Sequence, residues 1–194
     1  VVTVNDGATS ANDGAILAGF TADVEFNVAD DAGALISVMG TNDAASSLVE
    51  ANSITVDNDG LGDRIVNAND GAVLAGFTAD VSFDVVDTAN AVAAEITGAG
   101  NGLGDLDEAA DVVVASGDVD TADAAAIQQI SEYNASGSNY EITDTAAAVI
   151  GAGNSVIEND GVSLVEVTND ATAAEGVSLN LSLIHISEPT RPSV

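Results

Sequence analysis

The fold is decided by a stretch that occurs twice, as NDGAILAGFTADV at residues 12–24 and as NDGAVLAGFTADV at residues 69–81. The second copy begins 57 residues after the first, at residue 69 instead of residue 12. The same spacing separates three aspartates and three aromatic residues: Asp30, Asp87 and Asp144, and Phe26, Phe83 and Tyr140. Matching positions at one fixed spacing are the sequence signature of a repeat architecture. We therefore expect residues 1–180 to form stacked 57-residue repeats.

Short runs of alternating apolar and polar residues occur in each repeat, as at residues 24–28, 81–85 and 140–142. This alternation predicts strands with one buried face. Further strands are expected at residues 2–4, 54–56, 112–114 and 165–167, so that strands recur at about half the period. The polar residues between the buried ones should point outward and give the sheet one polar, acidic face. They are Thr3, Glu25, Asn27, Thr55, Ser82, Asp84, Glu141 and Glu166.

Alanine-rich stretches lie between these strands, at residues 33–39, 123–132 and 145–152, and their composition suits short helices. A strand and a helix in about 28 residues cannot bury an apolar face alone, but stacked coils can bury one together. Parallel strands joined by helices take right-handed crossovers. We therefore predict a right-handed α/β solenoid with one parallel sheet and the helices packed behind it. A β-solenoid is the alternative if glycines keep the alanine-rich stretches from being helical.

The third copy contains YEITDTAAAVI at residues 140–150, and VEVTNDATAAE follows at residues 165–175. These segments resemble the Asp-Thr-Ala-Ala repeats of very large secreted bacterial proteins, notably cyanobacterial ones. Those proteins are similar to adhesins, surface-layer proteins and haemolysin-type calcium-binding proteins. The first two copies depart from the motif, with DDA at residues 30–32 and DTAN at residues 87–90. The resemblance implies a structural, spacer or adhesive segment of a large extracellular protein, secreted or held at the cell surface.

The charge of the chain limits its partners. Its 194 residues include 32 Asp and Glu against 2 Lys and Arg, which gives a formal net charge of -30. Surfaces that bind phosphates or anionic lipids are basic, so this charge argues against nucleic-acid and membrane-surface partners. No apolar run reaches the roughly 18 residues that a membrane-spanning helix needs. We expect cations as partners, with cell-surface glycans or neighbouring repeats as further candidates.

The composition changes at residues 181–194, which hold the only His, both Pro and one of the two Arg. Residues 181–191, LSLIHISEPTR, resemble the in-frame translation of a sequencing-library adapter. We therefore expect an artefactual, disordered tail that takes no part in function, attached to a reading frame truncated at both ends. A natural short tail is the alternative.

Residues 1–180 contain no His, Cys or Lys and a single arginine, Arg64. Nucleophilic triads, histidine bases, zinc–imidazole sites, Schiff-base lysines and P-loops therefore each lack a required residue. The DTA segments at residues 87–89 and 144–146 are similar to the aspartic protease loop, but that chemistry needs two converging carboxylates. Each aspartate of this position precedes an alanine-rich stretch, so we expect Asp30, Asp87 and Asp144 to be helix caps. We expect no enzyme, and a carboxylate-based glycosidase is the enzymatic alternative.

Two acidic, glycine-rich loops are the candidate metal sites, DNDGLGD at residues 57–63 and NGLGDLD at residues 101–107. Carboxylates beside glycines place oxygen ligands in tight turns, as calcium requires. The candidate ligands are Asp57, Asp59, Asp63, Asp105 and Asp107. Ordinary Asx/Gly turns are the alternative, because neither loop has the ligand series of an EF-hand. Calcium is thus the expected cofactor, and a calcium-dependent carbohydrate- or surface-binding module is the alternative function.

Overall fold

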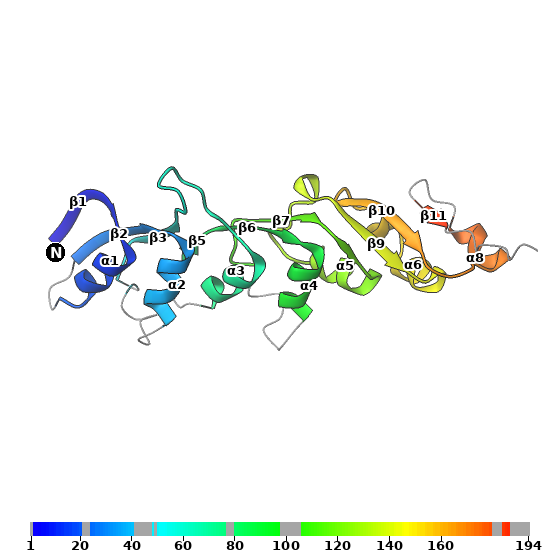
Figure 1. Cartoon of the computed structure of the whole chain (residues 1–194), viewed down its shortest axis with the longest axis horizontal. Helices are drawn as coiled ribbons and strands as arrows, with labels where there is room; N and C mark the ends of the chain where they lie inside the picture. Colours follow the sequence, from blue (N-terminus) through cyan, green and yellow to red (C-terminus); the bar gives the residue numbers. More distant parts are fainter. Residues whose placement is uncertain are drawn as a thin grey trace, which may run out of the picture. The chain divides into compact units, whose positions relative to one another are not determined.

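A computed structural model describes residues 2–20, 24–40, 48, 50–76, 80–97, 106–179 and 184–186. The chain is a mixed α/β protein with parallel sheets and short helices (Figure 1). It divides into two compact units, here called unit 1 (Val1–Val86 with Gly104–Val112) and unit 2 (Asp87–Leu103 with Val113–Val194). In the described part of the chain, no helix has the length and apolar character that a membrane crossing requires.

Unit 1 begins with alternating strands and helices. In chain order these are β1 (Val2–Thr9), α1 (Ala11–Ala18), β2 (Val24–Asp30), α2 (Ala32–Gly40), β3 (Ser53–Val56), β4 (Ile65–Val66), α3 (Ala68–Ala75) and β5 (Val81–Ser82). Four strands form a sheet in the order β1-β2-β3-β5, and α1 and α2 lie on the same side of β2 and β3 (Figure 1). The strands β6 (Asp84–Thr88) and β7 (Asp111–Ser116) begin in this unit, where β6 pairs with β4.

Unit 2 continues the same alternation. It contains α4 (Ala89–Thr97), β8 (Asp118–Val119), α5 (Thr121–Ile127), the 3-10 helix η3 (Ala135–Gly137), β9 (Tyr140–Asp144), α6 (Ala146–Ala152), α7 (Asn154–Ile157), β10 (Val162–Val167), α8 (Ala173–Ser178) and β11 (Ile184–Ile186). Its sheet has the order β11-β10-β9-β8. Of residues 181–194, the structure describes only the three of β11, which pair in parallel with β10.

Strands occupy the expected positions, and the alanine-rich stretches at residues 33–39 and 145–152 are helical almost throughout. The stretch at residues 123–132 is helical only as far as Ile127, where α5 ends. Helices α1 and α3 were not expected, although they form the very stretch that repeats. Gly14 and Gly71 lower the helix propensity there by about 1 kcal/mol each relative to alanine. An N-cap residue offsets this cost in both helices, because the side chains of Ser10 and Asn67 accept hydrogen bonds from first-turn amides.

The repeated aromatic residues form the centre of the core. Phe26, Phe83 and Tyr140 are 1%, 0% and 1% exposed, and the apolar residue two positions after each is also buried. Burying one such side chain contributes roughly 1.5–3 kcal/mol. The 57-residue spacing of these aromatic residues therefore corresponds to a buried position that recurs in each repeat.

Glycine brings the first helix of the first two repeats close to its strand. A β-carbon on Gly14 would lie 2.8 Å from Cγ2 of Val28, and one on Gly71 would lie 2.8 Å from Cγ2 of Val85. Real β-carbons essentially never approach that closely. The glycine of the NDGA segment is thus selected by packing against the strand.

The repeated aspartates at the strand ends also bind helices, but different ones from those expected. Oδ2 of Asp30 accepts a hydrogen bond of 2.9 Å from the amide of Ala11, the first residue of α1. Oδ2 of Asp144 accepts one of 3.1 Å from the amide of Thr121, the first residue of α5. Both aspartates therefore serve the helix that follows the neighbouring strand.

The helix that directly follows is capped by the next residue instead: Asp31 in α2, Thr88 in α4 and Thr145 in α6. The prediction that Asp30, Asp87 and Asp144 cap their own helices is thus wrong. Oδ1 of Asp87 accepts a hydrogen bond of 2.7 Å from the amide of Thr88. The geometric reason is that the carboxyl ends of parallel strands meet at one sheet edge, where each faces the start of a neighbouring helix.

Candidate functional site

The polar residues predicted to point outward from the strands avoid the core. Glu25, Asn27 and Glu141 are exposed, and Thr55, Ser82, Asp84 and Glu166 are partly exposed. The side chain of Thr3 lies outside the described residues. Within each unit, the described members of this set therefore give the strands a polar outer face that carries carboxylates, which we call the polar sheet face.

Hydrogen bonds across strands order the polar sheet face in unit 1. Asn27 and Ser53 are register partners on β2 and β3, and the Ser53 hydroxyl donates to Oδ1 of Asn27 over 3.0 Å. On the other side, the Thr9 hydroxyl donates to the Asn27 carbonyl over 3.1 Å. Cross-strand pairs of this kind each contribute about 0.2–1 kcal/mol.

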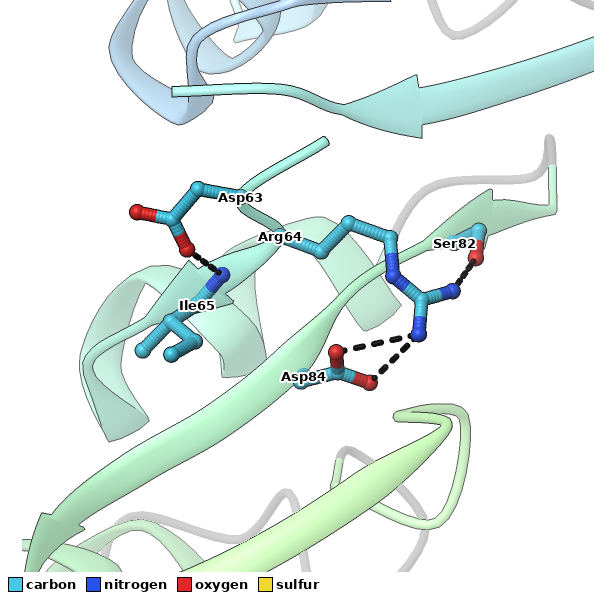
Figure 2. Close-up of polar contacts among 5 residues, drawn as sticks. All are labelled: Asp63, Arg64, Ile65, Ser82 and Asp84. Atoms are coloured by element: carbon cyan, nitrogen blue, oxygen red, sulfur yellow. Dashed lines mark hydrogen bonds and ion pairs between the residues drawn. The ribbon is translucent and has the colours of Figure 1, made fainter. Parts of the chain in front are cut away.

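A guanidinium group lies on the polar sheet face of unit 1, as Figure 2 shows. Nη1 of Arg64 donates to Oγ of Ser82 over 2.8 Å. Nη2 donates to both carboxylate oxygens of Asp84, over 3.2 and 3.0 Å. The carboxylate of Asp63 turns away and accepts from the amide of Ile65 instead.

Both partners of this ion pair are only partly shielded from solvent, because the side chains of Arg64 and Asp84 are 36% and 22% exposed. The guanidinium spans Ser82 and Asp84, which stand on one face because strand residues two apart point the same way. Planar guanidinium groups suit such acceptor pairs better than a compact ammonium does. At this position of unit 1, the polar sheet face thus holds a cation between two acceptors that are two residues apart.

Unit 2 has an open depression of about 290 Å³ on its own strands. It is lined by one glycine, Gly117, and by five residues with polar side chains, Ser116, Asp118, Asn139, Glu141 and Ser163. Asp118 and Glu141 are register partners on β8 and β9, and both are exposed. Two neighbouring carboxylates, an amide and hydroxyl groups make a site rich in acceptors, which favours a cationic ligand with several donors.

The first candidate calcium loop, residues 57–63, is held by its own backbone amides. Oδ1 of Asp57 accepts from the amide of Gly62 over 2.9 Å, and Oδ1 of Asp59 accepts from Leu61 and Asp63 over 2.7 and 3.2 Å. These bonds are the Asx turns of the alternative interpretation. Gly60 and Gly62 have φ angles of 71° and 98°, which favour glycine.

Hydrogen bonds also set the acidity of this loop, since the amides of Leu61 and Asp63 lower the pKa of Asp59. Asn58 gives the loop a further structural role, because its Oδ1 accepts from the amide of Ala32 at the start of α2. The loop is thus tied to the helix that follows the neighbouring strand.

The other candidate ligands divide between described and undescribed residues. Asp107 is partly exposed, and Asp105 lies outside the described residues. Among the residues that the structure describes, no group of three or more His, Cys, Asp or Glu side chains could hold a metal ion. Calcium binding at these loops remains a prediction.

Unit 2 contains a partly buried polar cluster that no sequence pattern predicted. Nε2 of Gln128 donates to the Tyr140 hydroxyl over 2.8 Å and to the Val156 carbonyl over 3.0 Å. The Tyr133 hydroxyl donates to Oδ1 of Asn159 over 3.2 Å. Burial raises the pKa of both tyrosines above the ordinary value of 10. The available signal was the tyrosine at a position where the other copies have phenylalanine.

Comparison of the chain with protein-family models, with curated proteins and with solved structures finds no match.

Proposed function

We propose that the chain is a non-enzymatic segment of a large extracellular bacterial repeat protein, which serves as a spacer, an adhesive element or part of a surface layer. The supporting observation is that two outward positions recur every 57 residues and hold polar side chains in each copy. The first position holds Glu25, Ser82 and Asn139, and the second holds Asn27, Asp84 and Glu141. All six are exposed or partly exposed.

We further propose that the repeats stack as a right-handed α/β solenoid with about 28 residues per coil. Within unit 1, β1, β2 and β3 are neighbours in sequence order, and α1 and α2 lie in the connections. Within unit 2, the same holds for β8, β9 and β10 with α5 and α6. Right-handed crossovers are the rule for parallel strands joined in this way.

Such a stack would function through its geometry. Neighbouring strands lie about 4.8 Å apart, so each added coil lengthens the polar sheet face by that distance. Reach would then follow from the number of repeats, and attachment would follow from many weak polar contacts along the face. Multivalent attachment of this kind raises avidity without any single strong site.

The alternatives have less support. The amide bonds of residues 57–63 explain that loop without calcium, so a calcium-dependent binding module remains the second hypothesis. A carboxylate-based glycosidase needs two carboxyl groups at a defined separation on either side of a bound sugar. Asp118 and Glu141 instead stand side by side on neighbouring parallel strands.

Adhesion and turnover should be measured on one preparation of the purified chain. We expect the labelled chain to be retained on bacterial cells or on their isolated surface polysaccharides, with no release of reducing sugar. The variant Glu25→Gln/Glu141→Gln should be retained several-fold less at equal fold stability, whereas Glu132→Gln, an exposed residue outside the strands, should match the parent chain. Sugar release would contradict the non-enzymatic proposal. Retention that ignores Glu25 and Glu141 would contradict attachment through the polar sheet face.

A further inference from the structure

The Arg64 site of unit 1 and the depression of unit 2 are equivalent positions of the repeat. In unit 1, Ile65 pairs with Asp84, and the amide of Asp84 donates to the carbonyl of Arg64. In unit 2, Asp118 pairs with Glu141, and the amide of Glu141 donates to the carbonyl of Gly117. Gly117 therefore occupies the backbone position of Arg64.

The flanking elements agree with this equivalence. Asn67 caps α3 three residues after Arg64, and Asp120 caps α5 three residues after Gly117. Val66 and Val119, which precede these caps, are each 5% exposed. The two sites thus share strand pairing, helix start and burial pattern.

The acceptors of the guanidinium also have counterparts in unit 2. Asn139 and Glu141 lie 57 residues after Ser82 and Asp84, and they flank buried Tyr140 as the earlier pair flanks buried Phe83. Both are among the residues that line the depression. Unit 2 therefore has an acceptor pair at the same two positions, with an amide in place of the Ser82 hydroxyl and a carboxylate as at Asp84. The arginine that donates to this pair in unit 1 is replaced by Gly117.

The charge of the depression favours an external cation. Asp118 adds a second carboxylate where unit 1 has the apolar Ile65. Within the described residues, the ion pair identified is that of Arg64 and Asp84, and neither Asp118 nor Glu141 belongs to it. Besides Arg64, the sequence has one Arg, Arg191, which lies outside the described residues, no Lys, and one His, His185, which pairs in register with Glu166 on β10.

We propose that the depression of unit 2 is a binding site for the guanidinium group of an arginine side chain presented by a partner polypeptide. One nitrogen of the guanidinium would donate to the Asn139 amide oxygen, and another would donate to the Glu141 carboxylate, as Arg64 does at Ser82 and Asp84. Asp118 supplies additional negative charge at the rim. This proposal is independent of the adhesive function, because binding of an arginine side chain can be measured on the isolated chain.

The test is a titration of the isotope-labelled chain with a Gly-Arg-Gly peptide whose two termini are blocked. Binding is monitored by amide NMR chemical shifts at physiological salt. Blocked Gly-Lys-Gly carries the same charge, and blocked Gly-citrulline-Gly has nearly the same shape without charge. We expect saturable shifts around Gly117, Asn139 and Glu141 with the arginine peptide, and weaker binding of the other two. An Arg191→Ala chain should behave identically, which excludes competition by the chain's own arginine.

Variants locate the site. Glu141→Gln should weaken binding of the arginine peptide by about tenfold, because a charge-assisted hydrogen bond is lost. Glu132→Gln makes the same chemical change at an exposed position outside the depression and should leave binding unchanged. A spectrum of Glu141→Gln that otherwise matches the parent shows that the fold is intact.

Removing the internal guanidinium provides an independent test. Arg64→Gly should open the equivalent site in unit 1, so that the arginine peptide also shifts the amides of Ser82 and Asp84. If that variant does not fold, the Glu141→Gln titration alone decides. Equal binding of the lysine peptide, or shifts spread evenly over the acidic residues, would overturn the proposal. Loss of cell adhesion with intact peptide binding would instead contradict only the proposed function.

Discussion

The two units fill the same core position with different chemistry. Unit 1 uses Phe26 and Phe83, whereas unit 2 uses Tyr140, and all three side chains are buried. The hydroxyl of Tyr140 accepts a hydrogen bond from Gln128, so the extra polar atom is satisfied. A buried hydroxyl without a partner would cost about 1–3 kcal/mol. A change at one position of the repeat is therefore tolerated when a partner changes with it.

The helices that pack on this aromatic position, α3 in unit 1 and α5 in unit 2, also differ between the units. Gly71 is the fourth residue of α3, and the fourth residue of α5 is Ala124, which is 0% exposed. In unit 1, a β-carbon at this position would meet Val85 and Phe83, at 2.8 and 3.3 Å. The close approach of helix and strand is therefore a property of unit 1, and unit 2 has space for a methyl group.

The largest expected effect comes from filling that close contact. Gly71→Val should destabilise unit 1 by about 3 kcal/mol, because overpacking forces the helix from the strand. Thermal unfolding followed by circular dichroism measures the loss. Gly151→Val in α6 is the matched control, since no atom lies within 4 Å of a β-carbon there. Equal losses in both variants would mean that helix propensity, and not packing, selects Gly71.

A reciprocal exchange of the aromatic residues tests whether the polar partner matters. Phe83→Tyr should cost unit 1 about 2 kcal/mol, because its hydroxyl enters a core that lacks the Gln128 partner. Tyr140→Phe should cost unit 2 about 1 kcal/mol, since Gln128 keeps its bond to the Val156 carbonyl. Chemical denaturation with amide exchange in each unit separates the two effects. A neutral Phe83→Tyr would show that the position accepts a hydroxyl without a partner.

The exchange also shows what the sequence determined. The repeat of Phe26, Phe83 and Tyr140 predicted the buried position, and alternation predicted which of their neighbours lie outside, as Glu25 and Glu141 do. The mixed α/β class followed from the alternating segments together with the alanine-rich stretches between them. Local patterns of this kind are set by residues close in the chain, which is why they can be read directly.

Contacts between a strand end and the helix that follows the neighbouring strand could not be predicted from such local patterns. The bond from Ala11 to Asp30 and that from Thr121 to Asp144 span 19 and 23 residues, and their partners follow from strand register. Register is a property of the assembled sheet. For the same reason, the equivalence of Arg64 and Gly117 appears only in the strand pairing, since they are 53 positions apart and outside the 57-residue spacing.

The strand-end aspartates provide a smaller contrast between the units. Asp144 accepts from both the amide and the hydroxyl of Thr121, whereas Asp30 faces Ala11, which has no hydroxyl. Asp144→Ala should therefore cost about 1 kcal/mol or slightly more, and Asp30→Ala should cost less. Melting temperatures at pH 7 measure both, and a larger loss for Asp30→Ala would contradict the role of the hydroxyl bond.

The pH dependence of Asp144 gives a second measurement. Burial raises its pKa, but the hydrogen bonds from Thr121 and Thr145 outweigh burial and hold the pKa below the ordinary value of 3.8. A carboxylate with a lowered folded-state pKa stabilises the protein above its unfolded-state pKa and loses that contribution as the pH falls through the folded-state value. The stability difference between the parent chain and Asp144→Asn should thus be full at pH 7 and shrink below pH 3.8. A difference that grows in acid would contradict the assignment.

The smallest expected effect is that of calcium on the loop at residues 57–63. When the free calcium concentration equals the dissociation constant, bound calcium would lower the unfolding equilibrium constant of unit 1 about twofold. The melting temperature of unit 1 should then rise more in millimolar calcium chloride than in sodium chloride of matched ionic strength. Asp59→Asn should abolish that excess, because it removes the charge while its oxygen can still accept from the amides of Leu61 and Asp63. Equal effects of the two salts would leave only screening of the -30 net charge, and the loop would then be an Asx turn without a metal.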